Sequence, residues 1–308
     1  MNGIIIKTTG EYYTVKTDNN EIVKCRLKGR FRIAGVKSTN PIVVGDRVSV
    51  EQESTIWMIV KLQERKNYIL RKSVNLSKQT HIIAANVDQA ILMITLDSPV
   101  TTTGFIDRFL VSAQAYAVDV ILLFNKIDLL KGKLKLEQEK LQKVYEKIGY
   151  KCFAFSVIND DLSIITTLMK GKVNIISGHS GVGKSTFINK LQPNLRINTK
   201  EVSEAHKQGQ HTTSFSELHE LDFGASIIDT PGIKGFGLVA LELNKIANYF
   251  PEFFALKVAC KFHNCIHKNE PDCAVKLALE QEEIAESRYE NYLDMLVEED
   301  GYFRTNGH

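Results

Sequence analysis

Residues 178–186 read Gly-His-Ser-Gly-Val-Gly-Lys-Ser-Thr, and this stretch decides the fold of the central part of the chain. Its spacing is G-x-x-x-x-G-K-[ST], a pattern in which backbone N–H groups wrap phosphate oxygens and glycines allow that close approach. An apolar run at 173–177 comes before it, and residues 185–191 follow with a helical pattern. The stretch therefore predicts a strand, a phosphate-binding loop and a helix whose N-terminus faces the phosphates.

Two residues of this loop have distinct expected roles. Lys184 is expected to reach the β- and γ-phosphates, and the Ser185 hydroxyl is expected to bind Mg²⁺. The residues expected to surround the phosphates are Gly178, His179, Ser180, Gly181, Val182, Gly183, Lys184, Ser185 and Thr186.

A second motif, N-K-x-D, follows the apolar run at 121–124 and consists of Asn125, Lys126, Ile127 and Asp128. Ligands bind at strand ends in sheets of this type. An Asp carboxylate accepts hydrogen bonds from both the ring N–H and the exocyclic amine of guanine, whereas adenine offers no such pair of donors. The motif therefore favours GTP over ATP. Ser156 follows another predicted strand, where GTPases place a small loop beside the guanine.

A third motif, D-x-x-G, begins at Asp229 and ends at Gly232 after the apolar run 225–228. Asp229 is expected to hold Mg²⁺ through water, and the Gly232 N–H is expected to contact the γ-phosphate. Between this motif and the phosphate loop, Thr213 or its neighbour Thr212 is expected to close over Mg²⁺, and the sequence does not choose between them.

The position after D-x-x-G holds Ile233, although many GTPases place a water-orienting Gln there. An isoleucine side chain cannot orient water, so intrinsic hydrolysis is expected to be slow. His211, beside the two threonines, is the nearest candidate for orienting the attacking water.

The motifs occur in the order N-K-x-D, phosphate loop, threonine segment and D-x-x-G, whereas ordinary GTPases begin with the phosphate loop. This order is a circular permutation, which is possible because the natural termini of such a sheet lie near each other. Apolar strand patterns and helical patterns alternate through this part of the chain. The alternation predicts a mainly parallel sheet covered on both faces.

The N-terminal part has short β-rich stretches separated by turn signals, which predict a small barrel of the OB type. Residues 1–80 hold 15 Lys and Arg against 7 Asp and Glu, and this excess suggests a nucleic-acid partner. In the basic stretch 29–41, Phe31 could stack on a base or pack on the barrel. The expected strands are Gly3–Thr8, Tyr12–Thr17, Ile22–Arg26, Arg47–Glu51 and Thr55–Leu62.

The C-terminal part contains Cys260, Cys265, His267 and Cys273 with the spacing C-x4-C-x-H-x5-C. Three thiolates and one imidazole complete a tetrahedral zinc site, and such a closed set indicates a structural role. His263 is an alternative imidazole ligand. The flanking stretches 241–254 and 274–297 have helical patterns, so zinc would stabilise a region too small to build its own core.

The composition, with 44% hydrophobic and 24% charged residues, is typical of a soluble globular protein. No apolar run approaches the roughly 20 residues that span a bilayer, and the N-terminus lacks a signal-peptide layout. The sequence therefore predicts a cytoplasmic protein without membrane association.

The permuted motif order, the basic N-terminal barrel and the Cys-His cluster together resemble the bacterial small-ribosomal-subunit-dependent GTPase A family. Members are circularly permuted GTPases that act in late maturation of the small subunit, and the resemblance covers the whole chain. It implies an OB-fold domain at 1–70, a permuted α/β P-loop GTPase domain at 71–238 and a mainly helical zinc domain at 239–308. The family pattern also favours His267 over His263 as a zinc ligand.

The resemblance further implies Mg²⁺-dependent hydrolysis of GTP to GDP and phosphate, one structural Zn²⁺, and the small ribosomal subunit with its rRNA as partner. Nucleotide state would control binding to the subunit and release from it. A monomer is expected, with neither DNA nor a membrane as partner. Two other function classes stay open: a GTP-gated RNA-binding module, favoured by Ile233, and a P-loop ATPase or small-molecule kinase, disfavoured by the N-K-x-D motif.

Overall fold

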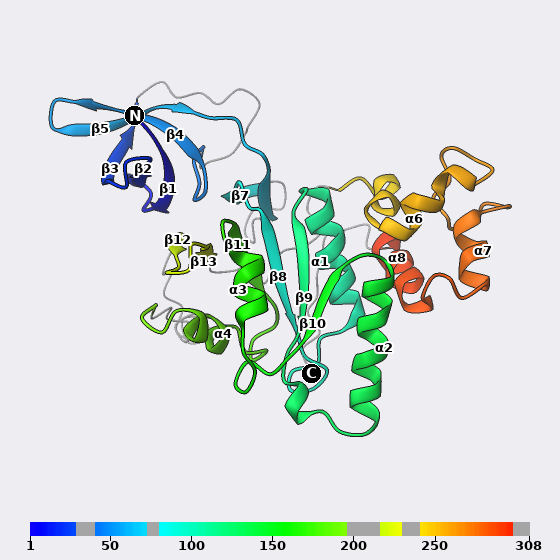
Figure 1. Cartoon of the computed structure of the whole chain (residues 1–308). Coiled ribbons are helices and arrows are strands. Elements are labelled where there is room, and N and C mark those ends of the chain that lie inside the picture. Colours follow the sequence, from blue (N-terminus) through cyan, green and yellow to red (C-terminus); the bar gives the residue numbers. More distant parts are fainter. Residues whose placement is uncertain (29–40, 73–79, 196–215, 230–240, 298–308) are drawn as a thin grey trace, which may run out of the picture.

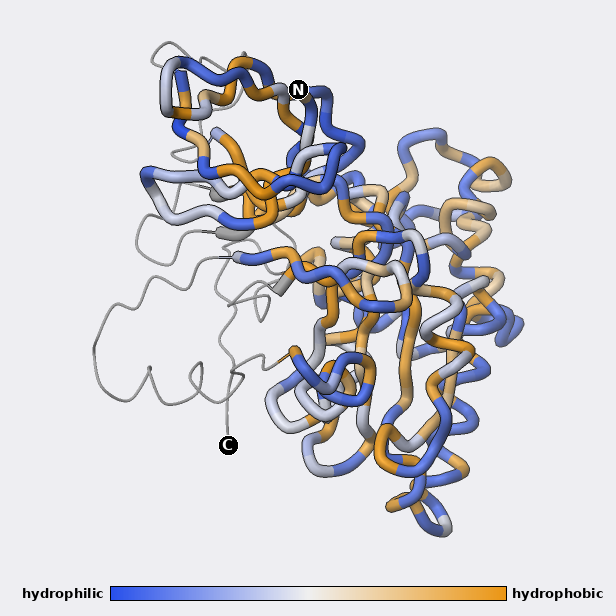
Figure 2. Tube along the Cα trace, turned by 60° about the vertical axis from the view of Figure 1, so that its left-hand side comes forward, coloured by the Kyte–Doolittle hydropathy of each residue, from blue (hydrophilic) through white to orange (hydrophobic). Residues whose placement is uncertain are grey.

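The computed structural model describes residues 1–28, 41–72, 80–195, 216–229 and 241–297. An N-terminal barrel and a central sheet are joined edge to edge, and a set of C-terminal helices lies on the other side of the central sheet (Figure 1). Hydrophobic residues are concentrated along the strands of the central sheet (Figure 2).

The barrel has the strand order β1-β2-β3-β5-β4, and pairing of β1 with β4 closes it. Strands β3 and β5 are parallel, whereas the other barrel pairs are antiparallel. Alternating side chains such as Ile5, Val15 and Val48 fill the interior. This architecture confirms the predicted OB-like barrel, with strands β1 (Asn2–Thr8), β2 (Tyr13–Thr17), β3 (Ile22–Leu27), β4 (Arg47–Glu53) and β5 (Ile56–Leu62).

The central sheet has the order β10-β9-β8-β11-β13-β12, in which only β12 is antiparallel to its neighbour. The carboxyl ends of the parallel strands therefore lie along one edge of the sheet. Strand β12 also pairs with β1 of the barrel, at Lys7 and Glu217. The strands are β8 (Gln89–Ile94), β9 (Asp119–Phe124), β10 (Lys151–Ala154), β11 (Val173–Ser177), β12 (Glu217–Glu220) and β13 (Ser226–Asp229).

Both faces of the central sheet are covered by helices, as the alternating pattern predicts. Leu92 and Leu122 face the core formed with α1 (Thr103–Ala115) and α2 (Lys133–Lys147). Their sequence neighbours point the other way, into the core formed with α3 (Ser163–Met169) and α4 (Lys184–Leu191). The period of two along each strand thus divides the apolar residues between two layers.

A hairpin of β6 (Tyr68–Lys72) and β7 (Thr80–Ala85) lies between the barrel and the central sheet. Val44 of the barrel region packs in the same core as Ile69 and Ala84, and the Ala85 N–H donates to the Val44 carbonyl oxygen (3.0 Å). Strands β6 and β7 and the short, mostly polar strand β12 were not predicted from the sequence.

The C-terminal helices are shorter than the sequence predicts. The stretch 274–297 is not one helix, because α7 (Ala274–Glu280) ends before Glu282, whose φ of 58° is left-handed, and α8 (Glu286–Val297) begins afterwards. The stretch 241–254 divides at Pro251, the first residue of α6 (Pro251–Leu256), since a proline cannot continue the preceding helix. The remaining elements of the described residues are the 3-10 helices η1 (Ile127–Leu129), η4 (Leu243–Tyr249) and η5 (Lys257–Ala259).

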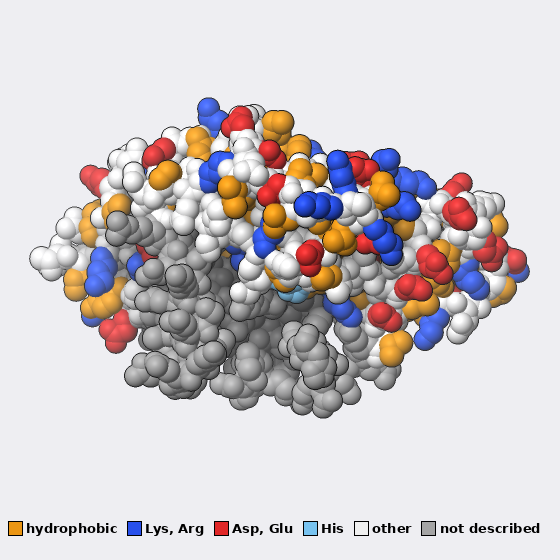
Figure 3. Space-filling model, turned by 90° about the horizontal axis from the view of Figure 1, so that it is seen from below, with side chains coloured by type: hydrophobic (Ala, Val, Ile, Leu, Met, Phe, Trp, Pro, Cys, Tyr) orange, Lys and Arg blue, Asp and Glu red, His pale blue; other side chains and the backbone are white. Residues whose placement is uncertain are grey.

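Charged side chains of both signs are intermixed on the face seen from below (Figure 3). None of the helices in the described ranges combines the length and apolar character that crossing a bilayer requires.

Candidate active site and metal centre

The described parts of the predicted motifs come together at the carboxyl edge of the central sheet. Asn125–Asp128 follow β9, residues 155–160 follow β10, the loop 178–183 follows β11, and Asp229 is the last residue of β13. Because β8, β9, β10, β11 and β13 are parallel, these segments are neighbours although they are far apart in the sequence.

Two glycines of the phosphate loop occupy places where no side chain fits. Gly178 has a φ of 142°, and a Cβ there would lie 2.5 Å from the Met93 carbonyl oxygen. Gly183 has a φ of 104°, and a Cβ there would lie 2.5 Å from Nδ2 of Asn125. The loop therefore packs directly on β8 and on the N-K-x-D motif.

Lys184 is the first residue of α4, and its Nζ donates to the carbonyl oxygens of Gly178 (2.7 Å) and His179 (2.6 Å). The ammonium group thus lies across the loop that is expected to hold phosphates. Ser185 and Thr186 follow in the first turn of α4, where the helix dipole favours an anion.

His179 stacks on Phe105 of α1, with ring centroids 4.1 Å apart and an angle of 34° between the ring planes. Burial lowers the pKa of His179, and the nearby Lys184 ammonium lowers it further. The imidazole is therefore neutral at neutral pH and adds no charge to the loop.

Asn125 joins three of the site segments. Its side-chain Nδ2 donates to the Val182 carbonyl oxygen (2.7 Å), and its Oδ1 accepts from the Val157 N–H (3.0 Å). The adjacent Lys126 has a left-handed φ of 64° and donates from Nζ to the Ser98 carbonyl oxygen (2.5 Å). One amide side chain thus fixes the phosphate loop relative to the 155–160 segment.

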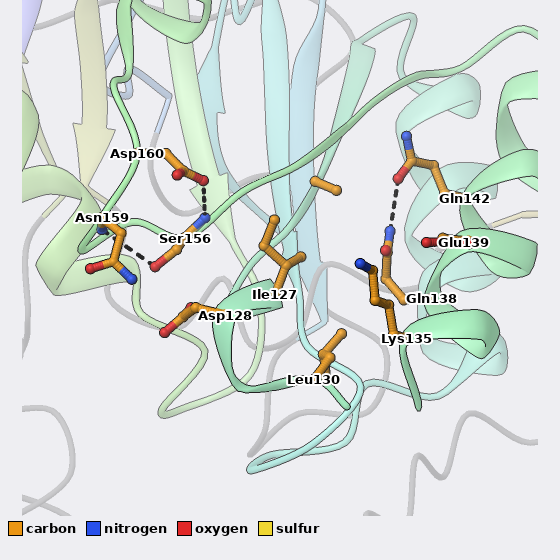
Figure 4. A pocket seen from close by; sticks show the side chains of 11 residues that line it. Ile127, Asp128, Leu130, Lys135, Gln138, Glu139, Gln142, Ser156, Asn159 and Asp160 are labelled. Atoms are coloured by element: carbon orange, nitrogen blue, oxygen red, sulfur yellow. Dashed lines mark hydrogen bonds between the residues drawn. The ribbon is translucent and has the colours of Figure 1, made fainter. Parts of the chain in front are cut away.

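A cavity of about 490 Å³ opens beside this junction. Asp128, Ser156, Asn159 and Asp160 lie on one side of it, and side chains of α2, including Gln138, lie on the other (Figure 4). Asp128 is one of the residues that line this cavity, and its carboxylate could accept from two donors on the edge of a purine.

Several predicted residues lie outside the described residues: His211, Thr212, Thr213, Gly232, Ile233 and Phe31. The contacts that Ser98, Phe105 and Lys190 make at the site were not predicted from the sequence. Ser98 and Phe105 come from segments that carry no nucleotide-binding motif, and Lys190 lies at the end of α4 away from the phosphate loop, so the roles of all three depend on the folded arrangement.

The C-terminal cluster brings four potential metal ligands together. One ligand atom from each of Cys260, Cys265, His267 and Cys273 can be chosen so that all lie within 4.8 Å of one another. The His267 Nδ1 is 3.6 Å, 3.4 Å and 3.3 Å from the sulfurs of Cys260, Cys265 and Cys273. A tetrahedral zinc with ordinary bond lengths requires nitrogen–sulfur distances of about 3.6 Å, so the set fits this ion.

The chemistry of the cluster also favours a cation. Burial raises the pKa of the Cys265 thiol to about 12, so a thiolate there requires a nearby positive charge. His267 is buried and has its pKa lowered by that burial, which keeps the imidazole neutral and able to coordinate. His263, the alternative, is exposed.

The loop around the cluster is held by backbone contacts. The Glu270 carboxylate accepts from the Ile266 N–H (2.8 Å) and the Lys268 N–H (2.9 Å), and the Tyr289 hydroxyl donates to the His267 carbonyl oxygen (2.7 Å). These bonds position His267 for coordination through Nδ1.

Comparison with known families identifies two segments of the chain. Residues 62–239 match the RsgA GTPase family, and residues 2–56 match the RsgA N-terminal domain. The chain belongs to the RsgA GTPase family. It is 54% identical to the small ribosomal subunit biogenesis GTPase RsgA of Flavobacterium johnsoniae, over 99% of this chain and 96% of that protein.

Two solved structures are similar to this chain over almost its whole length. The chain superposes on YjeQ from Thermotoga maritima with a TM-score of 0.81 and 32% identity, covering 98% of this chain and 99% of that one. It superposes on YloQ, described as a circularly permuted GTPase, with a TM-score of 0.74 and 28% identity, covering 96% of this chain and 93% of that one.

A further sequence relative, the small ribosomal subunit biogenesis GTPase RsgA of Bacteroides fragilis strain YCH46, is 50% identical over 99% of both chains.

Proposed function

We propose that this protein hydrolyses GTP to GDP and phosphate and serves the maturation of the small ribosomal subunit. The observation that carries the proposal is the junction at Asn125, where a guanine-type N-K-x-D motif and a phosphate loop meet at one sheet edge. The relatives named for small-subunit biogenesis match over almost their whole length, which supports the same cellular role.

In the proposed complex, Asp128 accepts from the guanine N1–H and N2 amine, and Lys126 lies over the purine with Ile127 and Ser156 beside it. The loop from Gly178 to Thr186 surrounds the phosphates. Lys184 leaves the Gly178 and His179 carbonyl oxygens and binds the terminal phosphates, a small movement of a flexible side chain.

Magnesium would be held by Ser185 and Thr213, with Asp229 acting through water. When bound, the ion supplies charge stabilisation for the leaving phosphate. Gly232 is proposed to contact the γ-phosphate, and His211 to orient the attacking water. The Cys260, Cys265, His267 and Cys273 set would hold one structural zinc.

The small subunit and its rRNA are the proposed partners, and nucleotide state would control binding and release. Exposed cations on the barrel support an RNA contact: Lys24 Nζ lies 4.0 Å from the centre of the Tyr12 ring, and the Arg26 guanidinium lies 4.6 Å from it. We propose a cytoplasmic monomer that acts on neither DNA nor membranes, with domains at 1–70, 71–238 and 239–308.

The decisive experiment is GTP turnover by the purified protein with and without small ribosomal subunits. The proposal expects slow turnover alone and stimulation by the subunits, since Ile233 cannot orient water. The Lys184→Ala variant is the negative control, and it should lose both the turnover of the protein alone and the turnover with small subunits. Tight GTP-dependent subunit binding without stimulation would instead support a GTP-gated RNA-binding module.

The same assay tests the proposed role of His211. The His211→Ala variant should keep GTP binding but lose most of the stimulated turnover, by roughly 10²–10⁴-fold if this side chain acts on the attacking water. Stimulated turnover that survives the substitution would assign the role to another group.

A further inference from the structure

The far end of α4 contacts the segment that borders the guanine side of the site. Lys190, in the last turn of α4, donates from Nζ to the carbonyl oxygens of Val157 (2.8 Å), Ile158 (3.2 Å) and Asp160 (2.6 Å). One ammonium group thus holds most of the turn that follows β10. Helix α4 therefore joins the phosphate loop at one end and this turn at the other.

The same turn is fixed from within. The Asp160 carboxylate accepts from the Ser156 N–H (2.6 Å), and the Asp160 N–H donates to the Ser156 carbonyl oxygen (2.9 Å). Phe155, just before it, packs edge-on against Phe187 of α4 with ring centroids 6.2 Å apart. The turn therefore packs on α4 through the contact of Phe155 with Phe187, and the hydrogen bonds of Lys190 bind it to the same helix.

The direction of the carbonyl groups sets the direction of the amides. In a trans peptide the C=O of one residue and the N–H of the next point in opposite directions. When Lys190 draws the Val157 and Ile158 carbonyl oxygens toward α4, the N–H groups of Ile158 and Asn159 are directed away from it. The turn lines the same cavity as Asp128, through Ser156, Asn159 and Asp160 (Figure 4).

Guanine presents three recognition groups along one edge: the N2 amine, the N1–H and the O6 acceptor. A carboxylate at Asp128 satisfies the first two and cannot donate to O6. The base therefore requires a donor beside Asp128. The N–H groups of Ser156, Val157 and Asp160 already donate to Asp160, Asn125 and Ser156. The suitable donors in the turn are the N–H of Ile158 and that of Asn159, which makes only a long bond of 3.4 Å to the Ser156 hydroxyl.

We propose that Lys190 is a positioning residue for guanine specificity, which holds the 156–160 turn so that the Ile158 and Asn159 amides meet guanine O6. The inference rests on the proposed function, because it assumes that the site binds a guanine nucleotide. It adds a specificity determinant that lies on the helix of the phosphate loop rather than in the guanine motif.

The test compares GDP with IDP, which keeps O6 but lacks the N2 amine. Competition against fluorescently labelled GDP measures both affinities for the wild type and for Lys190→Met. The variant should weaken GDP and IDP by the same factor, about three- to tenfold for the loss of charge-assisted bonds at a partly exposed site. The Asp128→Asn variant should instead weaken GDP more than IDP.

Two further variants separate position from charge. Lys135→Met removes an exposed lysine that lines the same cavity from α2, and it should leave both affinities unchanged. Lys190→Arg keeps the donor and should restore most of the affinity. Amide hydrogen exchange of Lys190→Met should increase in residues 155–160 and stay unchanged in residues 178–183.

The outcomes that contradict the inference are distinct from failure of the proposed function. Unchanged affinity despite faster exchange in the turn would assign Lys190 a structural role only. Faster exchange in the phosphate loop together with weaker binding would mean that the residue acts through α4. A wild-type protein that prefers neither GDP nor IDP over ADP would refute the proposed function itself.

Discussion

Among the charged contacts that join the outer regions of the chain to its GTPase core, two lie in opposite environments. Arg288 of α8 pairs with Asp107 of α1 (2.6 Å), and the two side chains are 1% and 0% exposed. Lys16 of the barrel pairs with Glu220 of β12 (2.5 Å), and these side chains are 22% and 53% exposed. The first contact is enclosed by protein, whereas water reaches the second.

The buried contact is a network rather than a single pair. The Arg288 guanidinium also donates to Glu252 of α6 (2.7 Å), and Asp107 accepts from Tyr145 (2.7 Å) and Asn291 (2.6 Å). Separating α8 from α1 would break all of these bonds at once, and removing one partner would leave the others buried without it, which is costly. The C-terminal helices should therefore move together with α1.

The exposed contact has different consequences. When a surface ion pair separates, water solvates both charges, so the free-energy cost is small. Strand β12 is followed in the chain by β13, which ends at Asp229 of the D-x-x-G motif. Loss of the Lys16–Glu220 ion pair alone should therefore cost little, because β12 stays attached to the barrel through its pairing with β1 and the ion pair of Lys7 with Glu217 (2.7 Å).

Removal of the metal should have the largest effect, and it should be confined to the C-terminal side. Structural zinc contributes roughly 10–16 kcal/mol in zinc-finger peptides. The Cys273→Ala variant should lose its zinc, seen as a fall from one ion per chain by elemental analysis. Its amide exchange should rise across residues 256–297 and stay unchanged in the barrel.

The matched control is Cys25→Ala, which removes a buried thiol from the barrel core, away from the metal cluster. It should keep one zinc per chain. Equal zinc content in Cys273→Ala and the wild type would show that the cluster does not bind the metal as a closed set.

Loss of the buried arginine should have the second-largest effect on stability. The Arg288→Met variant leaves Asp107 and Glu252 without their cation, so the free energy of unfolding should fall by about 3–5 kcal/mol. Lys147→Met is the control, because Lys147 donates to the Glu283 carbonyl oxygen at the exposed margin of the same interface. That control should cost less than about 1 kcal/mol.

The pH dependence of this loss has a defined sign. Burial raises the pKa of Asp107, although the Arg288 guanidinium opposes the rise. A carboxyl whose pKa is higher in the folded state binds a proton more tightly there, so stability increases as the pH falls toward that pKa. Without Arg288 the rise should be larger, and the destabilisation of Arg288→Met should shrink between pH 7 and pH 5. A penalty that grows over this range would contradict the buried-charge explanation.

The sequence predicted what depends on local pattern. The motif positions at 125–128 and 178–186 follow from residue types at fixed spacing, and the barrel follows from short β-rich stretches between turns. The break near Glu282 was not predicted because Glu282 is at a polar position of the helical pattern. Its left-handed backbone therefore leaves the spacing of the apolar residues unchanged. Strand β12 was missed because four mostly polar residues give no strand signal.

The long-range contacts could not be predicted in the same way. Arg288 and Asp107 are separated by 181 positions, and each alone resembles a surface charge on an amphipathic helix. Lys190 resembles an ordinary C-terminal helix lysine until the turn after β10 is placed beside it. Such roles arise from tertiary packing, which brings together residues with no shared local signal.

The exposed contact should give the smallest effect, and it is the strictest test of the comparison. A double-mutant cycle of Lys16→Met and Glu220→Gln should yield a coupling energy of about 0.2–1 kcal/mol, which falls as salt rises. The same cycle on Arg288→Met and Asp107→Asn should give a larger coupling that changes little with salt, because protein rather than ions surrounds that pair. Two couplings of similar size and salt dependence would mean that exposure does not distinguish the two contacts.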